Sequence, residues 1–104
     1  HHKINSKIFK KMKDTSFLIN TSRGKIVNER HMITALKKKQ IQGAGIDVYE
    51  LEPIEVKSKL LKLENVVLSP HIGSSTEETR YKMSEITVKN LISGLEGKKL
   101  LYSV

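Results

Sequence analysis

The 104 residues are enough for one small domain or for a piece of a larger one. No cysteine is present, which excludes disulfides and thiolate metal sites and fits a reducing cytoplasm, and no apolar run is long enough to cross a membrane. The net charge of +8 comes mainly from lysine, and aromatic residues are few, whereas nucleic-acid binding favours arginine, so we expect no nucleic-acid partner. We expect no membrane or metal partner either.

The first quarter of the chain predicts a short helix followed by a strand. Asn5 or Ser6 can cap a helix that turns Phe9 toward the interior. Residues 17–19 are wholly apolar, as expected for a strand buried on both faces of a parallel sheet. This strand ends shortly before Arg23.

The next segment predicts a helix and a second strand. Asn28 is a suitable cap for a helix with Leu36 on its buried side, and we expect Gly43 to end that helix. Residues 44–48 then form a strand. Residues 17–48 thus make a strand, helix, strand unit, which should be parallel and right-handed.

The last part of the chain predicts a third strand and a long helix. Residues 66–68 are apolar and precede a turn. Ser75 and Glu78 have the spacing of a capping box, and apolar residues recur after them at helical intervals. Gly94 or Gly97 is expected to end this helix.

Polar residues follow each of the three predicted strands: Arg23, the pair Asp47 and Glu52, and His71. The carboxyl ends of parallel strands share one edge of a sheet, so these side chains should converge on one crevice. A guanidinium can hold a carboxylate through two hydrogen bonds, and an imidazole beside a carboxylate can supply a proton. Spacing alone leaves open that Arg23 stabilises a loop, Glu52 is a solvated charge and His71 is a turn residue.

Three ordered strings carry a resemblance: NTSRG at residues 20–24, GIDVYELEP at residues 45–53 and SPHIGSSTEETR at residues 69–80. They resemble the C-terminal signature of the D-isomer-specific 2-hydroxyacid dehydrogenases, and most of all the glyoxylate and hydroxypyruvate reductases. The resemblance implies an α/β fold. Residues 1–75 would be the C-terminal half of a Rossmann-type parallel-sheet nucleotide-binding domain, and residues 76–104 a helix and tail that return to the substrate domain.

The resemblance also implies a role for each polar residue that follows a strand. Arg23 would bind the substrate carboxylate, His71 would be the acid and base, and Glu52 would bond His71 and keep it protonated. The backbone carbonyl of Thr21 and the carboxylate of Asp47 would orient the carboxamide of NAD or NADP. The full set of implied cofactor contacts is Thr21, Ser22, Arg23, Asp47, His71 and Gly73.

The implied function is that of an oxidoreductase, active as an intact homodimer, which transfers a hydride between NAD(P)H and a small 2-keto or 2-hydroxy acid such as glyoxylate or hydroxypyruvate. The chain lacks the G-x-G-x-x-G turn that binds the pyrophosphate, so we expect the 104 residues alone to be inactive. Two alternatives stay open. One is a dehydrogenase-like corepressor that acts by binding partners, and the other is a degenerate remnant that serves as a structural half-domain.

Overall fold

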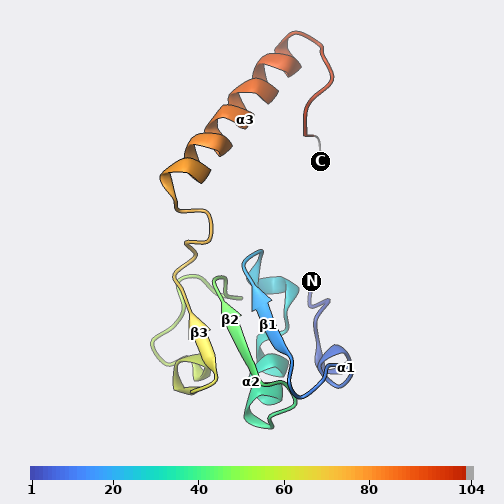
Figure 1. Cartoon of the computed structure of the whole chain (residues 1–104), viewed down its shortest axis with the longest axis vertical. Helices are drawn as coiled ribbons and strands as arrows, with labels where there is room; N and C mark the ends of the chain where they lie inside the picture. The colour runs from blue at the N-terminus through green and yellow to red at the C-terminus, as the bar shows by residue number, and fades with distance from the viewer. Residues whose placement is uncertain (103–104) are drawn as a thin grey trace. The chain divides into compact units, whose positions relative to one another are not determined.

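A three-stranded parallel sheet organises the first of two compact units (Figure 1). The computed structural model describes residues 1–102, and the first unit comprises His1–Gly73. The strands run in the order β1-β2-β3 and pair in register, Leu18 with Ala44 and Ala44 with Val66. Their bounds are β1, Phe17–Asn20; β2, Gly43–Ile46; and β3, Val66–Leu68. All three predicted strands and their parallel arrangement are therefore confirmed.

Helix α1 precedes β1 and α2 connects β1 to β2, and both helices begin where an asparagine side chain caps them. Asn5 caps α1 (Ser6–Phe9) by accepting a hydrogen bond from the Lys7 amide. Asn28 caps α2 (Glu29–Lys37) by accepting from the His31 amide, as predicted. Short 3-10 turns, which the sequence pattern did not predict, lie at Gly24–Ile26 and Lys59–Lys62.

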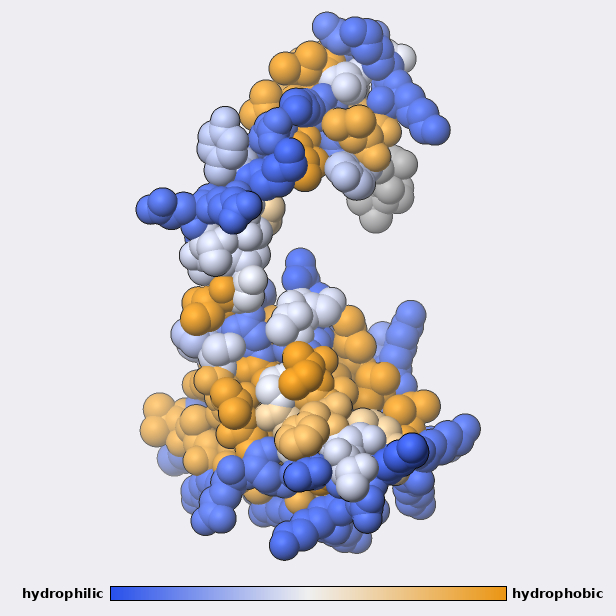
Figure 2. All heavy atoms as spheres, viewed as in Figure 1, coloured by the Kyte–Doolittle hydropathy of each residue, from blue (hydrophilic) through white to orange (hydrophobic). Residues whose placement is uncertain are grey.

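One face of the sheet carries the core of the first unit. A single cluster of buried side chains joins it to α1, α2 and the second 3-10 turn: Phe9, Val27, Met32, Ala35, Leu36, Ile41, Ala44, Ile46, Tyr49 and Leu60. Phe17, Ile19 and Val67 point away from this core and are 60%, 67% and 74% exposed. Figure 2 shows hydrophobic residues exposed over this unit. The expected burial of the strands on both faces is therefore wrong for the described residues, which cover one face only.

The second unit, from Ser74 onward, consists of α3 (Glu77–Leu95) and the tail that follows it. The tail is tied to the helix by Asn90, which bonds the backbone of Leu101 and Tyr102. No residue of α3 is buried among the described residues. None of the helices in residues 1–102 is both long and apolar enough to span a membrane.

The predicted capping box at the start of α3 is wrong. Thr76 is the cap, and its hydroxyl accepts a hydrogen bond from the Thr79 amide. The helix consequently begins one residue later than the box of Ser75 and Glu78 requires, and the Ser75 hydroxyl instead accepts from Arg80. A threonine hydroxyl satisfies a free amide of the first turn as well as a serine hydroxyl does, so the two neighbours could not be told apart locally.

Both α2 and α3 end with the same backbone arrangement. In each, a residue with positive φ is followed by an amide that bonds the carbonyl five residues earlier, which is the Schellman motif. Gly97 (φ +67) occupies that position after α3, so its predicted role is confirmed. After α2 the position is held by Lys39 (φ +52), and Gly43, which was expected to end α2, begins β2 instead.

Replacing Lys39 with glycine should stabilise the first unit. A left-handed conformation costs a residue with a Cβ about 1–2 kcal/mol, part of which is offset by the greater freedom of glycine in the unfolded chain, so we expect a net gain of roughly 0.5–1 kcal/mol. Urea unfolding of the chain, followed by circular dichroism, measures it. Lys38→Gly is the matched control, because Lys38 has φ −85 and gains nothing from glycine. Equal effects of the two substitutions would contradict this explanation.

Candidate active site

The four polar residues predicted to converge follow the carboxyl ends of the three strands. Arg23, Glu52 and His71 line one pocket of about 400 Å³, together with backbone and side chains of the same loops. Asp47 lies beside this pocket, where it bonds the loop that carries His71. The structure thus brings together a cation, a carboxylate and an imidazole that are far apart in the sequence.

A hydrogen bond of 2.8 Å joins His71 Nδ1 to Glu52 Oε2, as the resemblance implied. The other carboxylate oxygen of Glu52 accepts a hydrogen bond of 2.9 Å from the Tyr49 amide. The Tyr49 amide first and the His71 ring second lower the pKa of Glu52, so this carboxylate is ionised at neutral pH. Because Nδ1 is engaged, Nε2 is the ring nitrogen of His71 left to exchange a proton with a ligand.

Asp47 fastens the loop that carries His71 to the end of β2. Its buried carboxylate accepts hydrogen bonds from the amides of Ile72 (2.9 Å) and Gly73 (2.7 Å) and from the Ser69 hydroxyl. These bonds, the one from Ser69 foremost, hold the pKa of Asp47 below its usual value. The loop needs such support because His71 has φ +56, a left-handed conformation that is uncommon for a residue with a Cβ.

The predicted cofactor contacts Thr21, Asp47 and Gly73 lie next to one another. A Cβ built on Gly73 would come within 3.0 Å of Asp47 Oδ2 and 3.7 Å of Thr21 Cβ. The missing side chain therefore lets the Gly73 backbone lie close against Asp47 and beside Thr21, and these three residues are called the cradle below. Ser22, also predicted, is exposed in the turn after β1, where its carbonyl accepts a hydrogen bond from the Arg23 guanidinium.

Tyr49 is a site residue that the sequence reasoning missed. Its ring is buried, its hydroxyl donates to the Ser69 carbonyl (2.8 Å), and its amide holds Glu52. It therefore links both partners of the bond between Glu52 and His71 to the sheet. Its position between Asp47 and Glu52 was the one feature of the sequence that could have indicated a role for Tyr49 in the site.

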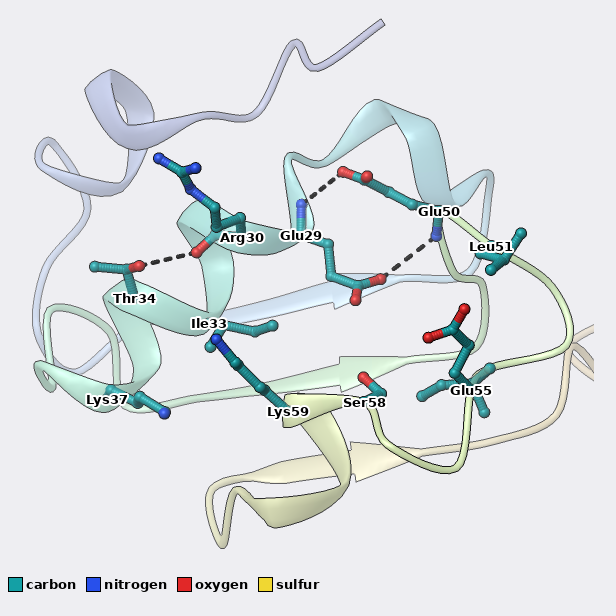
Figure 3. Close-up of a pocket in the computed structure, with 11 residues that line it drawn as sticks. Glu29, Arg30, Ile33, Thr34, Lys37, Glu50, Leu51, Glu55, Ser58 and Lys59 are labelled. Carbon is teal, nitrogen blue, oxygen red and sulfur yellow. Dashed lines mark hydrogen bonds between the residues drawn. The ribbon is translucent and has the colours of Figure 1, made fainter.

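A further pocket, of about 490 Å³, lies between α2 and the loop of residues 50–59 (Figure 3). It shares only Glu50 with the pocket of His71. Glu29 and Glu50 each accept a hydrogen bond from the other's backbone amide, and burial raises the pKa of Glu29. These carboxylates are engaged in joining α2 to the loop. No group of three or more metal-ligating side chains occurs within residues 1–102.

Gly24 determines how closely the turn after β1 approaches the loop after β2. A Cβ at this position would lie 1.9 Å from the Tyr49 carbonyl oxygen, which is backbone and cannot move aside freely. Only glycine allows this contact. It brings the adjacent Arg23 next to Glu52, and the positive charge of Arg23 contributes to the lowered pKa of Glu52.

Comparison with known proteins gives one consistent family. The family model described as D-isomer specific 2-hydroxyacid dehydrogenase, NAD binding domain, matches residues 1–73. The glyoxylate/hydroxypyruvate reductase B of Enterobacter agglomerans is 53% identical over 98 residues, which cover 94% of this chain and 30% of that protein. The enzyme of the same name from Escherichia coli K12 is 50% identical over the same shares.

Solved structures agree in fold. The NADPH-dependent glyoxylate/hydroxypyruvate reductase of Sinorhizobium meliloti, in complex with NADP and malonate, has a TM-score of 0.82 and 38% identity over 97% of this chain and 31% of that one. A glyoxylate reductase from Paecilomyes thermophila has a TM-score of 0.85 and 39% identity, over 99% and 31%. The chain thus spans about a third of the length of the proteins it matches.

Gly24→Ala should destabilise the first unit, because the new methyl group overlaps the Tyr49 carbonyl. Overpacking of this kind costs about 1–3 kcal/mol, measurable as a lower midpoint of urea unfolding. Gly94→Ala is the matched control: it lies within α3, its Cβ would approach no atom closer than 3.5 Å, and alanine favours helix. If Gly24→Ala were as stable as the unaltered chain, the close contact with Tyr49 would be wrong.

Proposed function

Since this chain belongs to the D-isomer specific 2-hydroxyacid dehydrogenases, we propose that it supplies the acid-base and carboxylate-binding residues of an enzyme that reduces a small 2-keto acid, such as glyoxylate or hydroxypyruvate, with NAD(P)H. The observation that carries this proposal is the pocket shared by Arg23, Glu52 and His71, with its 2.8 Å bond between imidazole and carboxylate. Its fold is that of the family's NAD-binding domain.

Each residue of the pocket has a distinct task in this proposal. Arg23 holds the substrate carboxylate through paired hydrogen bonds and so fixes the direction of the neighbouring carbonyl group. His71 gives a proton from Nε2 to the carbonyl oxygen during reduction and takes one back from the hydroxyl group during oxidation. Glu52, ionised and bonded to Nδ1, stabilises the His71 ring in the protonated form that precedes reduction and follows oxidation.

The cradle of Thr21, Asp47 and Gly73 fits a nicotinamide amide group. The carboxamide would have two acceptors there, the Thr21 backbone carbonyl and the remaining lone pair of Asp47 Oδ2, which already accepts from the Gly73 amide. Ser22 and Arg23 directly follow Thr21 in the turn after β1. The bound cofactor supplies the hydride, whereas the protein supplies orientation and the proton. The related structures contain NADP, NADPH or NAD+, which supports a nicotinamide cofactor and either form of it.

We further propose that α3 packs toward a substrate domain, with residues 1–75 and 76–104 in the separate roles given above. Several large apolar side chains of α3 are exposed among the described residues, which supports a partner for it: Tyr81, Met83, Leu91 and Leu95. The homodimer and the cytoplasmic location stay predictions. The corepressor and the structural remnant are less well supported, because the most similar relatives are reductases.

The test is a chimera in which this chain replaces the matching 98-residue segment of the Enterobacter agglomerans reductase. We expect the chimera to oxidise NADPH in the presence of glyoxylate. His71→Ala in the chimera should lower kcat by about 100-fold or more, because the general acid is lost, while the Kd for NADPH changes little. Absorbance at the reduced nicotinamide band and fluorescence titration measure the two quantities.

A charge control accompanies this test. Glu55→Gln removes an exposed carboxylate three residues from Glu52 and should leave kcat unchanged, whereas Glu52→Gln should lower it. A chimera with ordinary kcat after His71→Ala would show that His71 is not the acid. Failure of the unaltered chimera to turn over, although folded, would contradict the proposed function.

The 104-residue chain by itself should bind NADH with a Kd weaker than about 1 µM. It contains the nicotinamide cradle but no G-x-G-x-x-G turn for the pyrophosphate, which provides much of the affinity in such domains. Fluorescence titration of NADH with the purified chain measures this. Sub-micromolar binding would mean that the chain carries a pyrophosphate site of another kind.

A further inference from the structure

One buried polar side chain at the candidate site has no task in the mechanism above. Asn20, the last residue of β1, is only 7% exposed. Its Oδ1 accepts a hydrogen bond from the Ser22 amide (3.2 Å), and its Nδ2 donates one to the Arg23 carbonyl (3.2 Å). The side chain therefore closes the turn that leads from the strand to Arg23.

Asparagine suits this position because the turn presents one donor and one acceptor. A buried polar group left without a partner costs about 1–3 kcal/mol, and the single amide of Asn20 serves both groups at once. Aspartate could accept from Ser22 but could not donate to the Arg23 carbonyl. Alanine or leucine would satisfy neither group. The choice of side chain is thus explained by the shape of the turn and not by packing alone.

The turn in its closed form fixes the backbone of Arg23. The Arg23 carbonyl is held from one side by Asn20 and also accepts the Ile26 amide (3.2 Å), and the next residue, Gly24, contacts the Tyr49 carbonyl. The guanidinium itself is exposed and, within residues 1–102, donates a hydrogen bond to the Ser22 carbonyl (2.7 Å), which belongs to the same turn. The direction of the Arg23 side chain accordingly follows the geometry of the turn.

We propose that Asn20 is a positioning residue that aims Arg23 at the pocket of Glu52 and His71, and so determines how tightly the site holds the carboxylate of its substrate. This inference rests on the proposed function, since it assigns to Arg23 the binding of a carboxylate. Asn20 is not among the residues that line the pocket. Its side chain acts through the Ser22 amide and the Arg23 carbonyl.

Asn20→Ala in the chimera should weaken carboxylate binding without impairing the proton transfer. A displacement of the guanidinium by about 1 Å is enough to lower binding and turnover by roughly 10- to 100-fold at subsaturating substrate. We expect the KM for glyoxylate and the inhibition constant of malonate to rise together by at least about tenfold. The kcat at saturation should fall by a smaller factor than the KM rises, and the pH profile of kcat and the KM for NADPH should change by less than about twofold.

Asn65→Ala is the matched control. Its Nδ2 also donates to two backbone carbonyls, those of Leu36 and Gln42, but at the amino end of the sheet. It should lower stability without moving the KM for glyoxylate. Equal rises for both variants, or a loss confined to kcat, would overturn the positioning role. Asn20→Asp keeps the acceptor for Ser22 and should give a smaller rise in KM than Asn20→Ala.

Hydrogen exchange of the Ser22 amide tests the same inference without turnover. In the chimera this amide should exchange at least about tenfold faster after Asn20→Ala, because its acceptor is removed, and at an unchanged rate after Asn65→Ala. An unchanged rate after Asn20→Ala would overturn the inference. If the amide exchanges faster but the unaltered chimera does not reduce glyoxylate, the proposed function is wrong and the effect of Asn20 on the turn is not. Calorimetry with malonate would then measure whether Asn20→Ala weakens anion binding.

Discussion

The attachment of the β3 loop to the end of β2 through Asp47 is the interaction on which the site depends. One buried carboxylate accepts two backbone amides and a hydroxyl from residues on either side of His71. Without these acceptors the left-handed backbone at His71 would have little to maintain it, because such conformations persist only where their surroundings impose them. The bond between His71 and Glu52 follows from that attachment, since it requires the loop after β3 to reach the loop after β2.

Buried and exposed polar residues have different roles at this edge of the sheet. Asn20 and Asp47 are buried, engage backbone groups and fix the shape of the turns. Arg23, Glu52 and His71 are exposed and line the pocket, where a ligand can reach them. The two buried groups can be fixed because each satisfies several backbone donors or acceptors at once, which compensates for its removal from water. Tyr49 joins the two sets, as its amide holds Glu52 while its hydroxyl holds the Ser69 carbonyl.

Local signals predicted the elements well, and distant contacts account for what they missed. Asn28 was predicted as a cap, and Asn5 as one of two candidates with Ser6, because a cap bonds an amide two or three residues away, within reach of sequence reasoning. Gly43 was misassigned because its place is set by pairing with Phe17, 26 positions earlier, whereas Lys39 took the left-handed position after α2. In the site, motif strings pointed to Arg23 and His71. The side-chain bonds of Asn20 reach only Ser22 and Arg23 and are as local as those of a helix cap. The Tyr49 hydroxyl, by contrast, bonds the Ser69 carbonyl 20 positions later, and hydrophobic periodicity does not reveal such a distant contact.

The strands have apolar side chains on a second face of the sheet that the described residues do not cover. Phe17, Ile19 and Val67 alternate with core residues, yet they remain largely exposed on the second face of the sheet. Apolar residues on both faces are typical of parallel sheets covered by helices on each side, so the sequence pattern indicates a sheet that is packed on both faces. In the proposed enzyme the second cover would come from the remaining two thirds of the protein, which would also bring the pyrophosphate turn to the same edge. Burial of this face and completion of the cofactor site would then be consequences of one packing event. Glu52 and His71 need not move in it, because the hydrogen bond between them already lies within a single compact unit.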